Sequence, residues 1–174
     1  METNYNSVIV EKIKLEVAAC STHSKEKSKN HGQVFTPVNL INAMVDGIPL
    51  SSFHNPTKTF LDPCAGNGNF PAVLVVRLMQ GLSLHFKDEN ERYKHIMEKQ
   101  IFMGELLVEN AKNIERIFNP NGDLKLNLFV GDCLGPDFRN FFGWPYEIRL
   151  MKYPKNCIRW ILDNELKHDN HPVI

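Results

Sequence analysis

The amino-acid sequence predicts an α/β fold with a mostly parallel sheet and an N-terminal helical extension. Short apolar stretches at 58–62, 101–105 and 125–132 alternate with longer amphipathic stretches at 71–81 and 107–118. Strands that alternate with helices in this way form parallel sheets through right-handed crossovers. Hydrophobic residues make up 43% of the chain and charged residues 23%, which suits one ordinary globular domain.

The start of the chain forms an extension ahead of the main domain. Ile9, Ile13 and Val17 recur at four-residue steps and predict an amphipathic helix over residues 5–20. STHSKEKSKNHG (21–32) contains no apolar side chain, so it predicts a basic linker. We therefore expect two parts, a helix with its linker over residues 1–31 and the main domain over residues 32–174.

The main domain is expected to open with a helix. Thr36 can cap this helix, Pro37 can occupy its first turn, and Gly47 ends it. The first strand follows at 58–62. A mostly apolar helix over 71–81 comes next, with a proline at its start and a glycine at its end.

The second half of the main domain continues the alternation of helix and strand. A charged helix over 87–100 precedes the second strand at 101–105. A helix over 107–118 follows, and NPNGD (119–123) predicts a turn. Apolar and polar residues alternate in KLNLFVGD (125–132), which predicts the third strand.

Cysteine usage and hydropathy indicate the compartment. Cys20, Cys64, Cys133 and Cys157 stand far apart and form no Cys-x-x-Cys pair, which favours a reducing compartment and argues against a disulfide framework or a zinc site. No apolar run approaches the roughly 20 residues of a membrane span. The N-terminus is polar, unlike a secretory signal. We expect a cytoplasmic protein with no metal site and no membrane contact.

The charge balance bears on nucleic-acid binding. The chain has 20 basic and 20 acidic side chains, whereas a protein that holds DNA alone usually has a basic excess. Basic residues gather only locally, at 23–31 and between Arg139 and Lys167. Such patches are more often solvated loops, so we expect the isolated chain to bind DNA weakly.

Acidic residues stand at the end of each predicted strand. Asp62 precedes a loop with Gly66 and Gly68, Glu105 ends the second strand, and Asp132 ends the third. Ligands of open parallel sheets bind beyond these strand ends, and glycines let backbone N–H groups approach a polar ligand tail. An acid after the second strand can accept both ribose hydroxyls, and one after the third can accept an adenine amine. Each feature alone is as readily a turn or a helix cap; together they predict a bound adenosine.

Four segments resemble successive motifs of one enzyme family. GQVFTP (32–37), DPCAGNGNFP (62–71), FMGELLVENA (102–111) and VGDCL (130–134) are similar, in order and spacing, to motifs of S-adenosylmethionine-dependent DNA adenine-N6 methyltransferases. A dinucleotide dehydrogenase would more often show Gly-x-Gly-x-x-Gly without a preceding Asp-Pro. The resemblance implies a three-layer Rossmann-like methyltransferase fold, S-adenosyl-L-methionine as cofactor, and DNA methylation of the restriction–modification type.

The resemblance also implies roles for individual residues. Asp62 would lie near the methionine ammonium, Glu105 would hold the ribose hydroxyls, and Leu106 would pack on the adenine. The remaining cofactor contacts would come from the methionine pocket (Phe35, Thr36, Pro37), the loop backbone (Cys64, Ala65, Gly66, Gly68) and the adenine edge (Asp132, Cys133).

The family's acceptor loop has no clear counterpart in this chain. An Asp/Asn/Ser-Pro-Pro-aromatic segment after the fourth strand accepts hydrogen bonds from the target amine and stacks the flipped base. Trp144-Pro145-Tyr146 lacks the polar residue. CIRWILDNEL (157–166) would end a fourth strand at Asp163-Asn164, with Glu165 and Leu166 in place of the proline and the aromatic. Asn164 is therefore the candidate catalytic residue.

Chain length and motif content define the expected function. A full sheet of this family needs roughly 155 residues, whereas 116 run from Thr59 to Ile174. We therefore expect an incomplete sheet, no separate DNA-recognition domain, and a protein that binds S-adenosylmethionine and methylates DNA adenine weakly or with a protein partner. Three alternatives stay open: a minimal methyltransferase that uses Asn164 or the Trp144-Pro145-Tyr146 segment, as a monomer or a homodimer; a non-catalytic cofactor-binding subunit or decoy; and a lyase or hydrolase that consumes the cofactor without nucleic acid.

Overall fold

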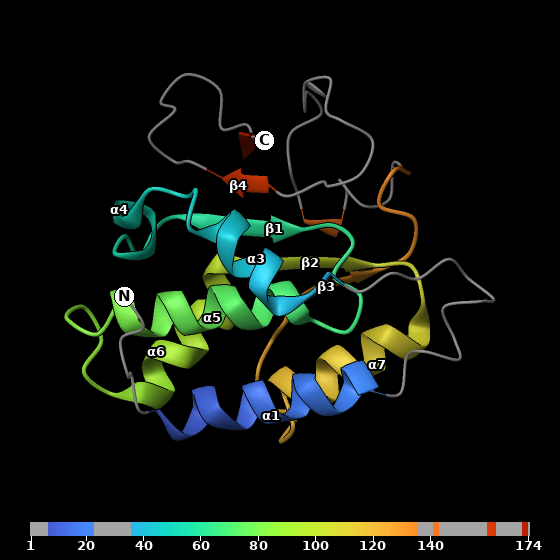
Figure 1. Ribbon diagram of the computed structural model, residues 1–174, viewed down its shortest axis with the longest axis horizontal. Coiled ribbons are helices and arrows are strands. Elements are labelled where there is room, and N and C mark those ends of the chain that lie inside the picture. The colour runs from blue at the N-terminus through green and yellow to red at the C-terminus, as the bar shows by residue number, and fades with distance from the viewer. Residues whose placement is uncertain (1–6, 23–35, 136–140, 143–159, 163–171, 174) are drawn as a thin grey trace.

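A computed structural model describes residues 7–22, 36–135, 141–142, 160–162 and 172–173 of the chain (Figure 1). Helices and one sheet make up this part of the molecule. In chain order the elements are α1 (Val8–Thr22), α3 (Val38–Val45), α4 (Leu50–Phe53), β1 (Thr59–Asp62), α5 (Asn69–Gly81), α6 (Glu89–His95), the π-helix η1 (Ile96–Gln100), β2 (Ile101–Glu105), α7 (Val108–Phe118), β3 (Asn127–Val130), β4 (Trp160–Leu162) and β5 (Pro172–Val173).

The sheet has the strand order β3-β2-β1-β4-β5. Strands β1, β2 and β3 run parallel, which confirms the α/β class, and each crossover contains a helix. Strand β4 pairs with β1 in the antiparallel direction, with Leu162 opposite Thr59, and β5 is antiparallel to β4. The expectation of a mostly parallel sheet therefore holds only for the first three strands. Leu162, the last described residue of β4, therefore lies beside Thr59 at the start of β1, whereas Asp62 lies at the other end of β1.

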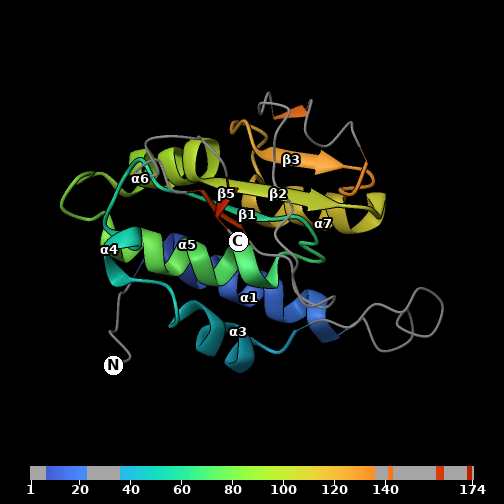
Figure 2. The same ribbon diagram turned by 90° about the horizontal axis from the view of Figure 1, so that it is seen from above.

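The described helices cover one face of the three parallel strands. Figure 1 draws α5, α6 and α7 on one side of β1, β2 and β3, with α1 farthest from the strands, and Figure 2, turned by 90°, draws α5, α1 and α3 on one side of β1. A three-layer fold needs helices on both faces of its sheet. Among the described residues the second helical layer is absent, so the structure supports the α/β class and not the full Rossmann-like architecture.

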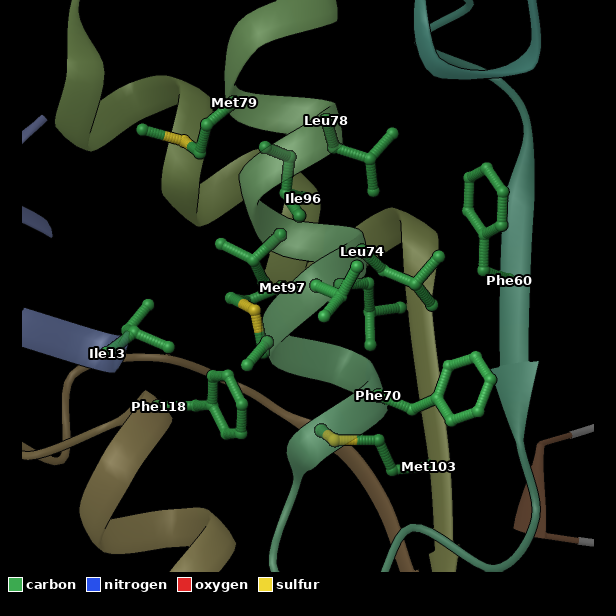
Figure 3. Packing of buried hydrophobic residues seen from close by; sticks show 14 of the residues in the cluster. Ile13, Phe60, Phe70, Leu74, Leu78, Met79, Ile96, Met97, Met103 and Phe118 are labelled. Carbon is green, nitrogen blue, oxygen red and sulfur yellow. The ribbon is translucent and has the colours of Figure 1, made fainter. Parts of the chain in front are cut away.

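The core lies between the sheet and α5. Phe60 of β1 and Met103 of β2 point toward this helix, which buries Phe70, Leu74 and Leu78 (Figure 3). Side chains alternate between the two faces of a strand, and residues three and four apart share one face of a helix. The apolar composition of 71–81 thus reflects a central helix, packed against the sheet on one side and against α1 and α3 on another.

The N-terminal helix is part of the same core. Val10, Ile13 and Val17 are buried, and α1 packs on both α5 and α7. Glu16 of α1 also forms an ion pair with Arg116 of α7. The predicted amphipathic helix is confirmed, although it begins at Val8 rather than at residue 5.

Helix starts differ from the sequence expectations. The N-cap of α3 is Pro37 and no side chain caps this helix, so the expectation that Thr36 caps it was wrong. Helix α5 begins at Asn69, two residues before Pro71. Proline is tolerated there because the first N–H groups of a helix have no intrahelical partner. The short helix α4 was not foreseen; a single turn is too short for a periodic pattern.

The second face of the sheet carries an aromatic cluster. Phe102 alternates with Ile101 and Met103, which lie in the main core, so its side chain points to the opposite face. Its ring centroid lies 5.3 Å from that of Phe142, and the Phe129 centroid lies 5.4 Å from that of Phe141. Rings at such separations attract one another. Residues 141–142 therefore supply side chains to the face that the described helices leave uncovered.

Several sequence expectations fall outside the described residues. These are residues 23–32 of the basic linker, Phe35, the 144–146 segment and Asn164. The linker was predicted to begin at Ser21, which was wrong, because Ser21 and Thr22 belong to α1. Within the ranges that the structure describes, no helix has the length and apolar character needed to cross a membrane.

Candidate cofactor site

The loop after β1 is held by its own backbone and by β2. The buried Asp62 accepts a hydrogen bond from the Cys64 N–H at its Oδ1, at 3.2 Å, which turns the chain after the strand. The Ala65 N–H donates to the Gly104 carbonyl at 2.9 Å, and the Gly68 N–H donates back to the Ala65 carbonyl at 2.8 Å. These hydrogen bonds fix the conformation of the loop.

The two glycines of the loop occupy left-handed backbone conformations. Gly66 has φ 56° and Gly68 has φ 88°, a region that glycine adopts without steric cost. A Cβ on Gly68 would also lie only 2.6 Å from Cε2 of Phe118. Gly68 is thus required for packing of the loop against α7. A close approach of either glycine to a cofactor stays a prediction.

Asn69 connects the loop to the segment before α3. Its Nδ2 donates to the Thr36 carbonyl at 3.4 Å, while its Oδ1 is buried and has no hydrogen-bond partner in the described structure. Asn69 is not among the site residues that the sequence predicted. A signal was available, since it is a polar residue at the start of a helix whose next residues are almost all apolar.

Glu105 links three parts of the site. Its Oε2 accepts from the Gly66 N–H at 2.7 Å. Its Oε1 accepts from the Leu107 N–H at 2.8 Å and from Nδ2 of Asn110 at 3.3 Å. The carboxylate is 6% exposed and joins the glycine loop, the start of α7 and the end of β2. The sequence indicated this acid but not its bonds or its partner Asn110.

The loop after β3 is anchored to β2 from the other side. The Gly131 N–H donates to the Glu105 carbonyl at 2.9 Å. Asp132 accepts from the Leu134 N–H at its Oδ1, also at 2.9 Å, and the Cys133 thiol lies 3.8 Å from the Gly131 carbonyl. Asp132 therefore caps its own turn, with a carboxylate that is not buried.

Electrostatics place these groups in one neighbourhood. Burial, together with smaller contributions from nearby Cys64, Glu105, Asp132 and Asp62, which disfavour another negative charge, raises the pKa of the Cys133 thiol to about 12. Such interactions require proximity, so the ends of β1, β2 and β3 converge as the sequence predicted. Among the described residues no group of side chains has the composition of a metal site.

Apolar side chains border this acidic cluster. Leu106, which follows the buried end of β2, is 64% exposed, and Leu134, in the loop after β3, is 81% exposed. Exposed leucines beside carboxylate acceptors can contact a flat ring while the acceptors bind polar groups at its edge. The predicted contact of Leu106 with adenine remains a prediction.

The fold and the site define an α/β domain with acidic strand ends and a glycine loop at one edge of its sheet. No family model matches the sequence. Over 73 residues the chain is 38% identical to a protein of Mycoplasma pneumoniae described as an uncharacterized adenine-specific methylase. The aligned segment makes up 40% of this chain and 17% of that protein. This similarity supports a relationship to a methyltransferase.

Proposed function

We propose that this chain binds S-adenosyl-L-methionine at the carboxyl ends of β1, β2 and β3, as a protein of the DNA adenine-N6 methyltransferase family. The convergence of Asp62, Glu105 and Asp132 around a preformed glycine loop is the observation that carries the proposal. The partial similarity to a protein described as an adenine-specific methylase supports the same chemistry.

The residues present fit this cofactor. Its adenine amine, ribose hydroxyls and methionine ammonium are hydrogen-bond donors, and the site offers mainly acceptors. The buried Oδ1 of Asn69 has no donor, and an unsatisfied buried acceptor costs about 1–3 kcal/mol. A donor from the methionine end of the cofactor would satisfy it, next to Thr36. Glu105 and Asp132 would serve the ribose and the adenine.

The bound cofactor would supply an electrophilic methyl group, and this chain would bind and orient it. The target base needs acceptors of its own, because the amine lone pair is delocalised into the ring. The sequence contains no Pro-Pro-aromatic segment, and Asn164 lies outside the described residues. We therefore propose that methyl transfer to DNA adenine is slow unless a second protein or a second copy supplies the acceptor groups.

Calorimetry tests cofactor binding. Titration with S-adenosylmethionine or S-adenosylhomocysteine is expected to give a dissociation constant near 1 μM, about −8 kcal/mol. Glu105→Ala should weaken binding by roughly 1–3 kcal/mol, the cost of a lost charged hydrogen bond. Glu115→Ala, an exposed carboxylate on α7, is the matched control and should bind normally. A folded protein that binds neither nucleoside contradicts the proposal.

Product analysis separates the alternative activities. The purified chain is incubated with labelled cofactor, with and without unmethylated DNA, and the products are identified by mass spectrometry. Rapid formation of N6-methyladenine that is lost in Asn164→Ala would favour a minimal methyltransferase over the slow enzyme proposed. Cofactor breakdown without DNA would indicate a lyase or hydrolase. An intact cofactor with no methylated product would indicate a binding subunit.

A further inference from the structure

The sequence contains two Asn-Gly dipeptides, Asn67-Gly68 in the glycine loop and Asn121-Gly122 in the turn after α7. In the first dipeptide the glycine N–H donates to the Ala65 carbonyl at 2.8 Å, and in the second it donates to the Asn119 carbonyl at 3.0 Å. Both glycines have left-handed backbone conformations, with φ 88° and φ 72°. Each asparagine is therefore the third residue of a turn that the following glycine closes.

The surroundings of the two dipeptides differ. Asn67 is 5% exposed, and its Oδ1 accepts from Nδ2 of Asn113 on α7 at 3.2 Å. Gly68 packs so closely on α7 that an added Cβ would lie 2.6 Å from a phenylalanine ring carbon. Asn121 and Gly122 are both exposed, and a Cβ added to this glycine would have nothing within 4 Å. The same dipeptide is thus held by α7 in one turn and open to solvent in the other.

An asparagine side chain can react with the peptide nitrogen that follows it. The nitrogen attacks the side-chain carbonyl carbon, the C–N bond of the side-chain amide breaks, and ammonia leaves with the proton of the peptide N–H. Water then opens the resulting five-membered cyclic imide at either carbonyl and gives aspartate or isoaspartate, so nothing is oxidised or reduced. Glycine favours the attack because it has no Cβ to shield the nitrogen.

The fold controls how easily the cyclic imide can close. The glycine N–H must leave its turn hydrogen bond, and the asparagine side chain must rotate onto the nitrogen. At the exposed turn water can replace the Asn119 carbonyl as the acceptor, so this local opening costs little. At Asn67 the same step breaks the bond to Asn113 and moves a loop that is packed on α7. Folding should therefore suppress the reaction at Asn67 far more than at Asn121.

We propose that Asn121 is a site of spontaneous modification, which converts to isoaspartate and aspartate in the folded protein, and that Asn113 protects the same dipeptide in the glycine loop. This inference is independent of the proposed function, because it concerns only amide groups of the chain itself. The modification adds one negative charge to a chain whose formal net charge is zero.

The exposed turn can accommodate the modified residue. Isoaspartate lengthens the main chain by one carbon at the position of Asn121. The side chain of Asn119 spans the turn, since its Nδ2 donates to the Leu124 carbonyl at 2.9 Å and its Oδ1 accepts from the Leu124 N–H at 3.0 Å. Neither bond involves Asn121, so the segment that leads into β3 stays held while the turn changes.

Peptide mass spectrometry on the full chain tests the proposal. The protein is incubated at mildly alkaline pH, native and in guanidinium chloride, and fragmentation by electron transfer distinguishes isoaspartate from aspartate after digestion. In the denatured chain Asn67 and Asn121 should convert at rates within about threefold of one another, whereas in the native protein Asn121 should convert about tenfold or more faster. A native ratio equal to the denatured one, or faster native conversion of Asn67, would overturn the inference.

Substitution of Asn113 tests its protective role. Asn113→Ala removes the side chain that holds Asn67, so native conversion of Asn67 should rise about tenfold while that of Asn121 stays unchanged. Lys112→Ala, at an exposed neighbour on α7, is the matched control and should change neither rate. An Asn113→Ala protein that melts earlier but keeps the slow Asn67 rate would make Asn113 purely structural and refute its protective role. If this variant does not fold, the wild-type comparison of the two sites still decides the inference.

Substitution of Gly122 tests the cyclic route. Gly122→Ala places a methyl group beside the attacking nitrogen, so conversion of Asn121 should slow about tenfold while conversion of Asn67 stays unchanged. Unchanged conversion of Asn121 in this variant would mean that the peptide nitrogen is not the nucleophile, and would overturn the inference.

Discussion

At the scale of single residues, the site is built from acceptors that already have partners. Glu105 and Asp132 each accept backbone N–H groups from their own loops. The sequence could indicate these acids because strand ends are recognisable from the apolar runs that precede them. It could not reveal that Glu105 reaches back 39 residues to Gly66, since such a contact depends on strand order in the folded sheet.

Gly68 provides a prediction about stability. Gly68→Ala forces a Cβ to within 2.6 Å of the Phe118 ring in a left-handed conformation, so unfolding should become easier by about 2 kcal/mol or more. Gly122→Ala is the control, because Gly122 has φ 72° but nothing within 4 Å of the added Cβ. It should cost only about 1 kcal/mol, the backbone contribution. Urea denaturation of both variants measures the difference; equal losses would contradict the packing role of Gly68.

The Cys133 thiol provides a prediction about pH. Burial, with the nearby negative groups, raises its pKa to about 12 from an ordinary value of 9.0. Between these values the unfolded chain loses the thiol proton and the folded chain keeps it, so this group's contribution to stability is lost as pH rises from about 9 to 12. Cys133→Ser should remove that part of the pH dependence.

Alkylation gives a second measurement on the same thiol. Iodoacetamide at pH 8 should label the exposed Cys64 before Cys133, because the thiolate is the reactive form. Peptide mass spectrometry at increasing times gives the order. Faster labelling of Cys133 than of Cys64 would contradict the half-buried environment and raised pKa of Cys133.

At the scale of helices and strands, the sequence was most informative where periodicity was long. The spacing of Ile13 and Val17 predicted α1, and β2 spans the predicted residues 101–105. The start of α5 was missed because Pro71 resembles a first residue, whereas the chain becomes helical at Asn69. The sequence could not predict that β4 runs antiparallel to β1, because an apolar run of a few residues carries no information about parallel or antiparallel pairing.

Helix α1 should contribute strongly to folding stability. Ile13 is buried where α1 meets the core, so Ile13→Ala should lower the free energy of unfolding by about 2–5 kcal/mol. Leu15→Ala lies on the same helix at a side chain that is 71% exposed and should change stability by less than about 0.5 kcal/mol. Chemical denaturation monitored by circular dichroism compares the two. Similar small effects would mean that α1 does not pack on α5 and α7 in solution.

At the scale of the whole molecule, the described chain is a sheet with helices on one face and aromatic rings on the other. The sequence predicted the α/β class from alternating elements, and the three parallel strands confirm it. It also predicted a second helical layer, through its resemblance to a family, and the described residues do not contain one. The motifs that carry the resemblance lie mainly at the strand ends, so they say little about which elements cover the second face of the sheet.

Net charge leads to a prediction about DNA. With 20 basic and 20 acidic side chains, the chain should bind duplex DNA only in the nonspecific range, with a dissociation constant of roughly 1–100 μM at physiological salt. Alanine at Lys25, Lys27 and Lys29 should flatten the salt dependence measured by fluorescence anisotropy. Alanine at the exposed Lys12, Lys112 and Lys125 is the control and should leave that dependence unchanged. Tight, sequence-selective binding by the wild-type chain would contradict this.

Two adjacent carbonyls of β2 hold the loops on either side of the site. Gly104 accepts from Ala65 in the loop after β1, and Glu105 accepts from Gly131 in the loop after β3. Neither loop can detach without exposing backbone groups of the central parallel strand. A ligand bound at the proposed site would meet loops that are already fixed by these bonds, so little of its binding energy would be consumed in arranging them. Recognition at the proposed site would then depend on fit to these fixed loops rather than on closure around the ligand.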